Sequence, residues 1–316
     1  MNFLRSVAAA ALLPAVLALA GAATAQTPPV RFGLLGDMPY FDLEESGFAR
    51  LLAAYDAEAF DFIVHVGDFK SGVSDCSDAL FEARRKQFDA SAHPFVFTPG
   101  DNEWTDCARV FAGRHDPLER LAKLRTLFAP PGVTLGRRTL RVERQTDYPE
   151  NARWSAGAAV FATFNMPGPD NHARAMPEEA RARNAANLAW LRALFAAARA
   201  GGACCVGLFT QANIFGGFPG PPTPRAAFVP FIEALAREVA DFPGAVLFAN
   251  GDTHFHRIDQ PMKDARSGQP LRNFTRVEVY GSPVMHGLAI SIVTEDGRAG
   301  FRIAPFPPFT IAPGAQ

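Results

Sequence analysis

Four Gly-Asp dipeptides are the residues of this sequence whose type and placement could do chemistry. Each follows a short apolar run typical of a β-strand. In an open α/β sheet, ligands bind beyond the carboxyl ends of the strands, so aspartates placed there from four strands would converge in one crevice. Glycine lets the backbone turn sharply where a strand ends, which aims the next side chain into that crevice. The four aspartates are Asp37, Asp68, Asp101 and Asp252.

Clustered carboxylates repel one another, and a bound metal ion is the usual means of neutralising them. The last dipeptide is followed by a histidine, His254, a further metal ligand. Gly and Asp are also common turn residues at solvent-facing strand ends, which is the alternative interpretation. Recurrence at four strand ends in register favours the metal site.

The elements that would position these residues are short apolar runs alternating with longer segments of helical period. This alternation predicts helices flanking a sheet, with a strand-rich tail. We expect strands at residues 30–35, 62–66, 94–97, 158–164, 206–210, 245–249, 276–280, 288–294 and 300–303, and helices at residues 43–57, 78–91, 118–128, 178–200 and 226–240.

Composition restricts the class of partner. The chain has 316 residues, 48% of them hydrophobic, with 31 Lys and Arg against 32 Asp and Glu and a formal net charge of −1. These values exclude a disordered or collagenous chain. Without a long basic run, the usual electrostatic basis for binding nucleic acid or an anionic membrane is missing, whereas a small ligand fits.

The first 25 residues are typical of a secretory signal. Arg5 precedes an apolar stretch, and Ala23-Thr24-Ala25 forms an A-x-A cleavage site. Pro14 interrupts the stretch and argues against the alternative, an N-terminal membrane anchor. We therefore expect an exported protein, periplasmic or secreted, whose residues 26–316 form one domain. No later apolar run is long enough to span a bilayer, so no membrane association is expected after cleavage.

Export favours disulfides, although four cysteines are too few for a disulfide scaffold. Cys76 and Cys107 each follow a Gly-Asp turn by a few residues, which would place them on neighbouring loops, and we predict a bridge between them. Adjacent Cys204 and Cys205 begin an apolar run, where small buried thiols are more common than a strained vicinal bridge.

Five motifs occur in a recognisable order: GDMPY, GDFKSG, GDNEW, FTQAN and GDTHFH. This order resembles that of the calcineurin-like metallophosphoesterases, which include the purple acid phosphatases. The resemblance extends from Arg31 to about His256, and its specificity comes from motif order and strand context. It implies a four-layer α/β/β/α sandwich, a two-metal site and hydrolysis of small-molecule phosphate esters.

Carried over residue by residue, the resemblance assigns metal binding to Asp37, Asp68 and His254, which match the family pattern. The first motif departs from it, because Pro39 stands where the family has a histidine, with Tyr40 next to it.

The later motifs depart further. Asp101 stands where the family has a metal-binding Asn, and Asn102 where it has the catalytic His. Gln211 replaces the mid-chain His, and Asp252 replaces the first His of the last motif. These replacements make a ligand set rich in oxygen, which favours Mg, Mn or Ca over Zn or Fe. Catalysis would then depend on His254 and on Asn102, which could donate a hydrogen bond to a phosphoryl group but could not act as an acid.

Three further residues are candidates for substrate contact. Asn171 and His172 follow the strand at 158–164, whose end would lie at the same crevice, and Trp104 could offer a stacking surface. Capping, turn and loop-shaping roles are the alternatives. For His65 we expect a packed sheet position, and for His256 a position on the face opposite His254.

Three hypotheses follow. The first is an exported metal-dependent phosphoesterase with a carboxylate-rich site. The second is a binding protein that keeps the phosphoesterase scaffold without catalysis, and the third is a structural cation site without a substrate. Replacement of imidazoles by Asp and Gln preserves oxygen ligands and favours the enzyme, whereas loss of the catalytic His favours the binding protein.

Overall fold

The computed structural model describes residues 29–217 and 220–308. The predicted signal, residues 1–25, lies outside the described residues. Among the helices of the described ranges, none is both long and apolar enough to cross a bilayer.

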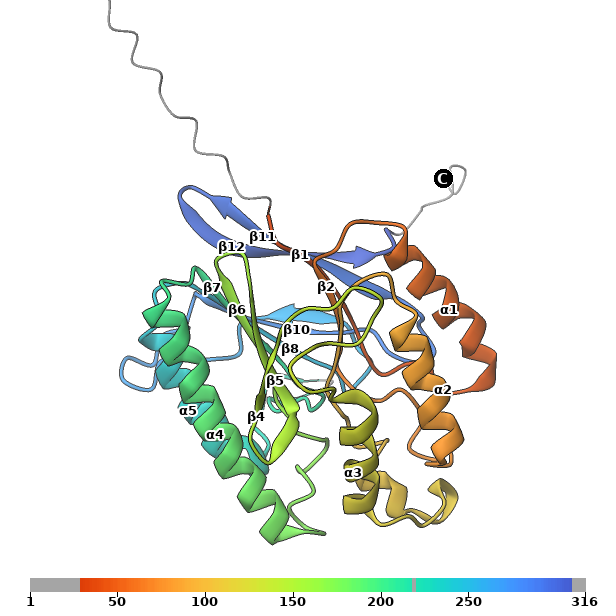
Figure 1. The fold of residues 1–316 in the computed structure, drawn as a ribbon. Coiled ribbons are helices and arrows are strands. Elements are labelled where there is room, and N and C mark those ends of the chain that lie inside the picture. The colour runs from red at the N-terminus through yellow and green to blue at the C-terminus, as the bar shows by residue number, and fades with distance from the viewer. Residues whose placement is uncertain (1–28, 218–219, 309–316) are drawn as a thin grey trace, which may run out of the picture.

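Two sheets pack face to face at the centre of the molecule (Figure 1). In the described part of the chain, one has five strands in the order β12-β11-β1-β2-β3, and the other has seven in the order β4-β5-β6-β7-β8-β10-β9. The first sheet comprises β1 (Arg31–Leu35), β2 (Phe62–His65), β3 (Phe95–Phe97), β11 (Gly287–Glu295) and β12 (Arg298–Phe306). The second comprises β4 (Glu143–Gln145), β5 (Tyr148–Ala156), β6 (Ala159–Thr163), β7 (Cys205–Phe209), β8 (Ala245–Asn250), β9 (Arg257–Asp259) and β10 (Phe274–Glu278).

Helices cover the outer face of each sheet, so the layers run α/β/β/α as predicted (Figure 1). Local sequence sets some of their starts: the Ser77 hydroxyl accepts a hydrogen bond from Leu80 N, and the Asp116 carboxylate accepts one from Leu118 N. The helices are α1 (Asp42–Asp56), α2 (Asp78–Asp89) and α3 (Pro117–Phe128) on the first sheet, and α4 (Pro177–Ala200) and α5 (Val229–Ala240) on the second. Short 3-10 turns are η1 (Thr105–Ala108), η2 (Val110–Ala112) and η3 (Ala226–Phe228).

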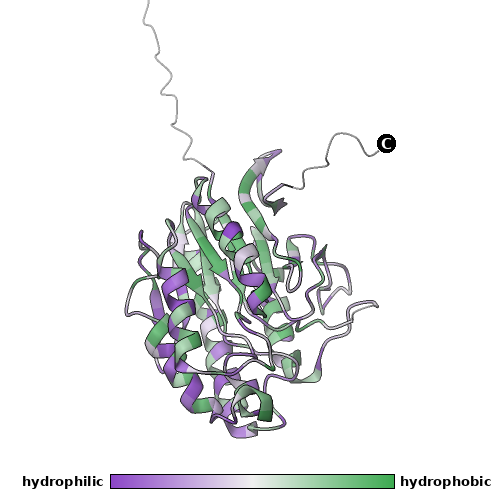
Figure 2. Cartoon of the chain, turned by 90° about the vertical axis from the view of Figure 1, so that its right-hand side faces the viewer, coloured by the Kyte–Doolittle hydropathy of each residue, from purple (hydrophilic) through white to green (hydrophobic). Residues whose placement is uncertain are grey.

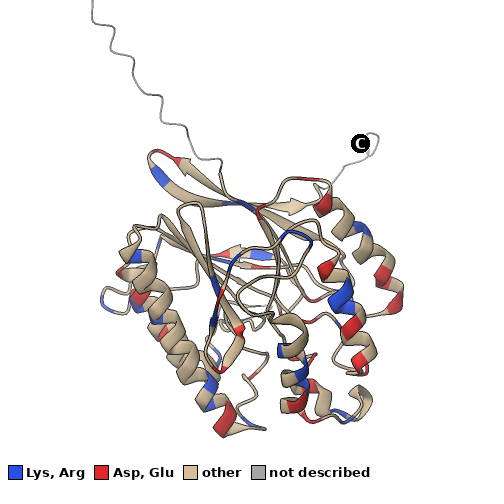
Figure 3. Ribbon diagram, in the orientation of Figure 1, with Lys and Arg blue, Asp and Glu red and all other residues tan. Residues whose placement is uncertain are grey.

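Three apolar clusters fill the spaces between the layers. The one between the sheets includes stacked and edge-on rings of Phe32, Phe62, Phe161 and Phe209. Figure 2 shows the hydrophobic strands inside and the mixed colouring of the helices around them. Basic and acidic residues are interspersed along those helices (Figure 3). The two sheets are thus fixed against each other by aromatic packing.

Parallel pairing brings the functional loops to one edge of each sheet. Strands β1, β2 and β3 run parallel, as do β6, β7, β8 and β10. Because parallel strands end on the same side, the Gly-Asp turns after β1, β2 and β3 are neighbours, and the turn after β8 lies beside the end of β7.

The predicted helices and strands are confirmed to within a few residues. Strands β4, β5 and β9 were not predicted from the sequence. The run Tyr148–Ala156 is polar at alternate positions and lacks the continuous apolar pattern of the other strands, yet it pairs antiparallel with β6 near the edge of the second sheet.

The predicted disulfide between Cys76 and Cys107 is confirmed, with a Cα–Cα distance of 5.7 Å. Both sulfurs lie 3.7 Å from the backbone oxygen of Asn102. Cys204 and Cys205 are thiols; Cys205 is buried and Cys204 is half-buried, with 3.2 Å between their sulfurs.

Candidate functional site

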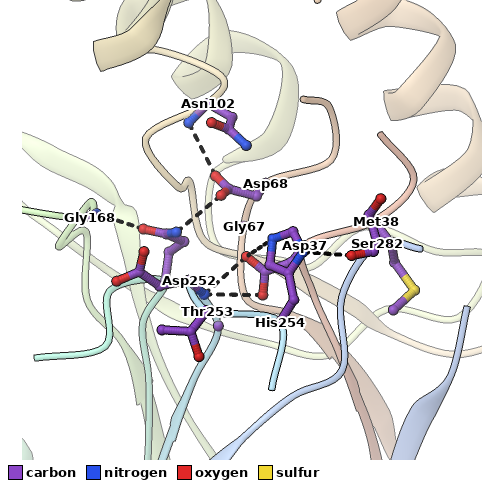
Figure 4. Close-up of polar contacts among 12 residues, drawn as sticks. Asp37, Met38, Gly67, Asp68, Asn102, Gly168, Asp252, Thr253, His254 and Ser282 are labelled. Atoms are coloured by element: carbon purple, nitrogen blue, oxygen red, sulfur yellow. Dashed lines mark hydrogen bonds and ion pairs between the residues drawn. The ribbon is translucent and has the colours of Figure 1, made fainter. Parts of the chain in front are cut away.

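The four predicted aspartates meet where the two sheets face each other, and we refer to Asp37, Asp68, Asp101 and Asp252 as the carboxylate cluster. Figure 4 shows Asp37, Asp68 and Asp252 of this cluster. Three of them turn the chain through a left-handed conformation immediately after a strand, with φ of 52° at Asp37, 58° at Asp68 and 87° at Asp252. Asp tolerates this conformation better than most side chains. The turn directs each carboxylate to the neighbouring loop.

Two glycines leave space for carboxylates of the cluster. A Cβ atom at Gly100 would lie 2.0 Å from Oδ1 of Asp68, and one at Gly251 would lie 2.1 Å from Oδ2 of Asp37. Each glycine therefore makes room for the aspartate of another Gly-Asp turn. The recurrence of the dipeptide has a packing cause in addition to the need for a sharp turn.

Asp37 connects the two sheets. Its carboxylate is fully buried and accepts hydrogen bonds from the backbone N of Asp252 at 3.0 and 3.2 Å. Burial, followed by the nearby charge of Asp252, raises the pKa of Asp37 well above its usual value.

Asp68 is held by three donors. Oδ1 accepts from the backbone N of Asn102 at 3.1 Å (Figure 4). Oδ2 accepts from Gln211 Nε2 at 3.0 Å and from the Tyr40 hydroxyl at 3.2 Å. Burial, then the charges of Asp101 and Glu103, raise the pKa of Asp68 well above its usual value.

Gln211 directs its amide nitrogen, not its oxygen, at the cluster. Its Oε1 accepts from the backbone N of Gly168 at 2.7 Å, which fixes the orientation of the amide. The donor then faces Asp68. In this orientation Gln211 stabilises a carboxylate and presents no ligand oxygen to a cation beside Asp68.

His254 and Asn102 both contact Tyr40. His254 Nδ1 donates to the backbone oxygen of Ser282 at 2.7 Å, and Nε2 lies 2.9 Å from the Tyr40 hydroxyl and 4.0 Å from Oδ1 of Asp37. Asn102 Nδ2 donates to the Tyr40 hydroxyl at 3.0 Å and to Lys70 O at 2.9 Å. Both amide protons of Asn102 are therefore engaged within the protein, which does not fit the predicted donation to a phosphoryl group.

Asp101 and Asp252 form the more accessible side of the cluster. Burial, then the charges of Asp106 and Asp252, raise the pKa of Asp101 to about 8. Oδ2 of Asp252 accepts from Asn213 N at 3.0 Å and from Arg225 Nη1 at 2.7 Å. Both oxygens of Asp101, and Oδ1 of Asp252, accept no hydrogen bond from any other residue that the structure describes.

Tyr40 and Arg225 were not identified as site residues from the sequence. Tyr40 stands one position beyond the expected histidine, so motif alignment placed Pro39 there instead. Arg225 follows a Gly/Pro-rich loop outside every motif. Glu103 shapes the loop after β3: it is fully buried and accepts from Gly100 N at 2.8 Å and Asp68 N at 3.0 Å. Burial raises its pKa to about 7.

The three residues predicted to contact a substrate interact instead with other side chains of the protein. The buried Asn171 amide donates to Asn184 and accepts from Arg183. Trp104 is fully buried, edge-on to His172 and beneath the Arg183 guanidinium, which does not fit an exposed stacking surface. His172 is only partly buried.

His65 has the packed sheet position that was expected. His65 is fully buried, with Nδ1 accepting from Gly67 N and Nε2 donating to Met38 O, and burial lowers its pKa to about 3. His256 bonds to the backbone oxygen of Glu278 and stacks on Tyr280.

The larger cavities lie elsewhere. One of about 760 Å³ lies at the amino ends of β7, β8 and β10, lined by Cys204, Arg272 and Arg298 among others. Ionisable side chains with shifted pKa values gather at the carboxyl ends instead. We therefore locate the site by its chemistry and not by cavity volume.

Solved structures with the same architecture identify the fold. The chain aligns with a dimetal phosphatase from Danio rerio at a TM-score of 0.52 and 13% identity, covering 83% of this chain and 92% of the other. A purple acid phosphatase, PPD1, from yellow lupin (Lupinus luteus) aligns at a TM-score of 0.52 and 12% identity, over 84% of this chain and 50% of the other. The chain has the metallophosphoesterase fold.

A third structure with this fold is GAP50, described as the anchor in the inner membrane complex of Plasmodium. It aligns at a TM-score of 0.51 and 11% identity, covering 88% of this chain and 84% of the other. No protein-family model matches the sequence, and no curated protein matches it. The metallophosphoesterase fold therefore rests on three-dimensional similarity.

A ready-made metal centre of the metallophosphoesterase type is not formed. No three His, Cys, Asp or Glu side chains converge on one metal position among the residues that the structure describes. The carboxylates predicted as ligands lie close together, but some of their oxygens already accept hydrogen bonds from the protein. Asp68 accepts from Gln211 and Tyr40, and one oxygen of Asp252 accepts from Arg225.

The donor set that remains fits one hard cation. The oxygens of Asp101 and Oδ1 of Asp252 are open, and repulsion between these two carboxylates contributes to the raised pKa of Asp101. Mg, Mn and Ca prefer carboxylate oxygens and complete their shells with water. Asp101 and Asp252 would hold such an ion.

Proposed function

We propose that this chain is an exported phosphoesterase that hydrolyses small-molecule phosphate esters with the help of Mg, Mn or Ca. The observation that carries the proposal is the convergence of four strand-end aspartates from two sheets within the metallophosphoesterase fold. Export rests on the signal-like residues 1–25.

Asp101 and Asp252 hold the cation in this proposal. When bound, the cation supplies Lewis-acid activation of the phosphoryl group and of water. Asp101 is partly exposed and Asp252 lies at the same side of the cluster, so the ester approaches there.

Proton transfer falls to His254 and Asp68, joined through Tyr40. The His254 side chain is 24% exposed, and its Nε2 faces the cluster, where it can protonate the departing alkoxide. Once His254 has given up its proton, the Tyr40 hydroxyl turns its own proton toward Nε2, and Asp68 Oδ2, freed of that donor, accepts the proton of the attacking water. The Tyr40 hydroxyl contacts both groups and passes the proton from Asp68 back to His254, so the site is reset when the alcohol leaves.

Tyr40 stays protonated in this role, because burial and the charges of Asp68 and Asp37 hold its pKa above its ordinary value. A neutral phenol both donates and accepts a hydrogen bond, as such a transfer requires.

A second candidate is a non-catalytic binding protein. The hydrogen bonds that Gln211, Tyr40, Asn102 and Arg225 make to the carboxylates favour it, because a site satisfied by protein donors needs less from a cation. GAP50, with the same fold, is described as an anchor.

An assay on full-length mature protein separates the two. Hydrolysis of an aryl phosphate and a bis-aryl phosphate is measured with Mg, Mn, Ca, Zn and Fe, for the parent, Asp68→Asn and His254→Ala. Residues outside the carboxylate cluster supply matched controls, the exposed Asp296→Asn and the half-buried His115→Ala. Metal-stimulated turnover that is lost in the first two variants and kept in the controls supports the enzyme. Absence of turnover with every metal would contradict the enzyme and favour the non-catalytic binding protein.

A further inference from the structure

A phosphate ester is an anion, yet the proposed site is built from carboxylates. Asp37, Asp68, Asp101 and Asp252 lie close enough to raise one another's pKa values, and Glu103 and Asp106 add to the negative field. A single divalent cation offsets two of these charges. Binding of an anion there calls for a further positive group with an accessible head.

Lys70 does not meet that requirement. It is buried, and its ammonium group donates to the backbone oxygens of Ser71 at 2.8 Å and Asn102 at 2.6 Å. Its charge supports the third loop from within. Burial lowers its pKa, as expected for an ammonium enclosed in the protein.

Arg225 meets the requirement for a positively charged side chain that is accessible at the site. Its side chain is 28% exposed, and Nη1 donates to Oδ2 of Asp252 at 2.7 Å and to the backbone oxygen of Pro169 at 3.2 Å. Both bonds use one nitrogen. The other two nitrogens of the planar fork have no hydrogen-bond partner among the described residues.

The backbone fixes Arg225 in this place. Its N donates to Ile214 O at 3.1 Å, and its own oxygen accepts from Phe228 N at 2.9 Å at the start of η3. The stem packs at Gly216, which has a φ of 52° and where a Cβ would lie 3.4 Å from Cγ of Arg225. The guanidinium is therefore anchored at both the backbone and Asp252.

We propose that Arg225 is the anion-recognition residue of the site and that it selects phosphate monoesters over diesters. This inference rests on the proposed phosphoesterase function and names its substrate class. A guanidinium fork binds two oxygens of one phosphoryl group side by side. A monoester presents three unesterified oxygens and two negative charges, whereas a diester presents two oxygens and one charge, so the fork favours the monoester.

The first measurement is calorimetric titration with inorganic phosphate in the presence of MgCl₂, using the parent, Arg225→Gln, Arg225→Lys and a surface control, Arg302→Gln. We expect Arg225→Gln to weaken phosphate binding about 10- to 100-fold, the range for loss of hydrogen bonds to a charged group. Arg225→Lys keeps the charge beside Asp252 but loses the fork, and should weaken binding less. The control should match the parent.

The second measurement compares kcat/KM for the aryl phosphate and the bis-aryl phosphate. Arg225→Gln should lower the value for the monoester about 10-fold more than for the diester. The Arg225 variants also remove the hydrogen bond to Asp252. Titration of the same variants with Mn²⁺ checks that Asp252 still binds the cation without it.

The outcomes separate this inference from the proposed function. Phosphate binding that depends on Arg225, without hydrolysis of either ester, supports anion recognition by Arg225 and contradicts the proposed phosphoesterase function. Hydrolysis together with unchanged phosphate affinity in folded Arg225→Gln and Arg225→Lys supports the phosphoesterase function and overturns the proposed role of Arg225. Absence of phosphate binding by the parent, or equal losses for both esters, also overturns it.

Discussion

The hydroxyl of Tyr40 lies 2.9 Å from Nε2 of His254, joining the loop after β1 to the loop after β8. The same hydroxyl contacts Asp68 and Asn102. Loops from both sheets therefore share one oxygen atom, which belongs to the residue next to the position where the family motif has a histidine.

Replacing Tyr40 with Phe should reduce hydrolysis about 10- to 100-fold, because it removes hydrogen bonds to a carboxylate and an imidazole without changing the ring. Tyr55→Phe is the matched control, since the buried Tyr55 hydroxyl bonds only to the backbone oxygens of Leu34 and Leu288 among the described residues. The control should lower the melting temperature and spare the specific activity. Equal activity losses in the two variants would contradict the role of Tyr40.

Replacing Gly100 with Ala should displace Asp68, because the new Cβ would lie 2.0 Å from Oδ1. We expect loss of activity and a destabilisation of about 1 to 3 kcal/mol, as for other overpacked positions. Gly300→Ala is the comparison, since no described atom lies within 4 Å of a Cβ there. Steady-state assays and urea unfolding measure both. A fully active Gly100→Ala enzyme would show that the position of Asp68 is unimportant.

Stability of the metal-free protein should fall as the pH rises from 7 to 9. Burial raises the pKa of Asp101 to about 8, whereas an unfolded Asp titrates near pKa ~3.9. The folded chain thus binds more protons than the unfolded chain in this window, and its stability decreases by up to about 1.4 kcal/mol per pH unit for each such proton. His65, with a pKa lowered to about 3, is neutral in the folded chain, and an unfolded His with a pKa of ~6.5 is mostly neutral above pH 7, so it opposes the trend only weakly.

Thermal unfolding in EDTA across this range tests the sign, with Asp101→Asn as the comparison. The variant should show a shallower slope, and added Mg should stabilise the parent most at the alkaline end. A melting temperature that rises from pH 7 to 9, or identical slopes for the two proteins, would contradict the expected titration.

Removing the disulfide by Cys76→Ser with Cys107→Ser should cost about 3 to 4 kcal/mol of unfolding free energy, from the closed loop alone. The two cysteines are 31 residues apart, and both sulfurs contact the backbone oxygen of Asn102, so activity should fall as well. Replacement of Cys204 with Ser, outside this contact, is the control. Denaturant unfolding that is unchanged in the double variant would show that the bridge contributes nothing.

Much of this fold follows from the sequence, because its central strands are continuous apolar runs that end at Gly-Asp turns. Asp37, Asp68, Asp101 and Asp252 could be placed together since parallel strands fix where their ends lie. Strand β5 could not be recognised, because a strand with polar alternate positions lacks that pattern.

The side-chain partners could not be predicted in the same way. The orientation of Gln211 depends on the backbone N of Gly168, and the pairing of Arg225 with Asp252 depends on a loop outside the motifs. Both contacts join segments far apart in the chain, and neither leaves a local pattern in the sequence. Trp104 illustrates the opposite case: its type suggested an exposed ring, but tertiary packing buries it against Arg183.

The packing of the two sheets has a consequence for how ligands would act on the whole molecule. Asp68 and Asp101 extend from one sheet, whereas Gln211 and Asp252 extend from the other. A ligand that contacts residues of both groups binds only when the two halves are docked, so its binding energy opposes their separation. Occupancy would therefore slow amide hydrogen exchange in β2 and in β8 together, although these strands belong to different sheets.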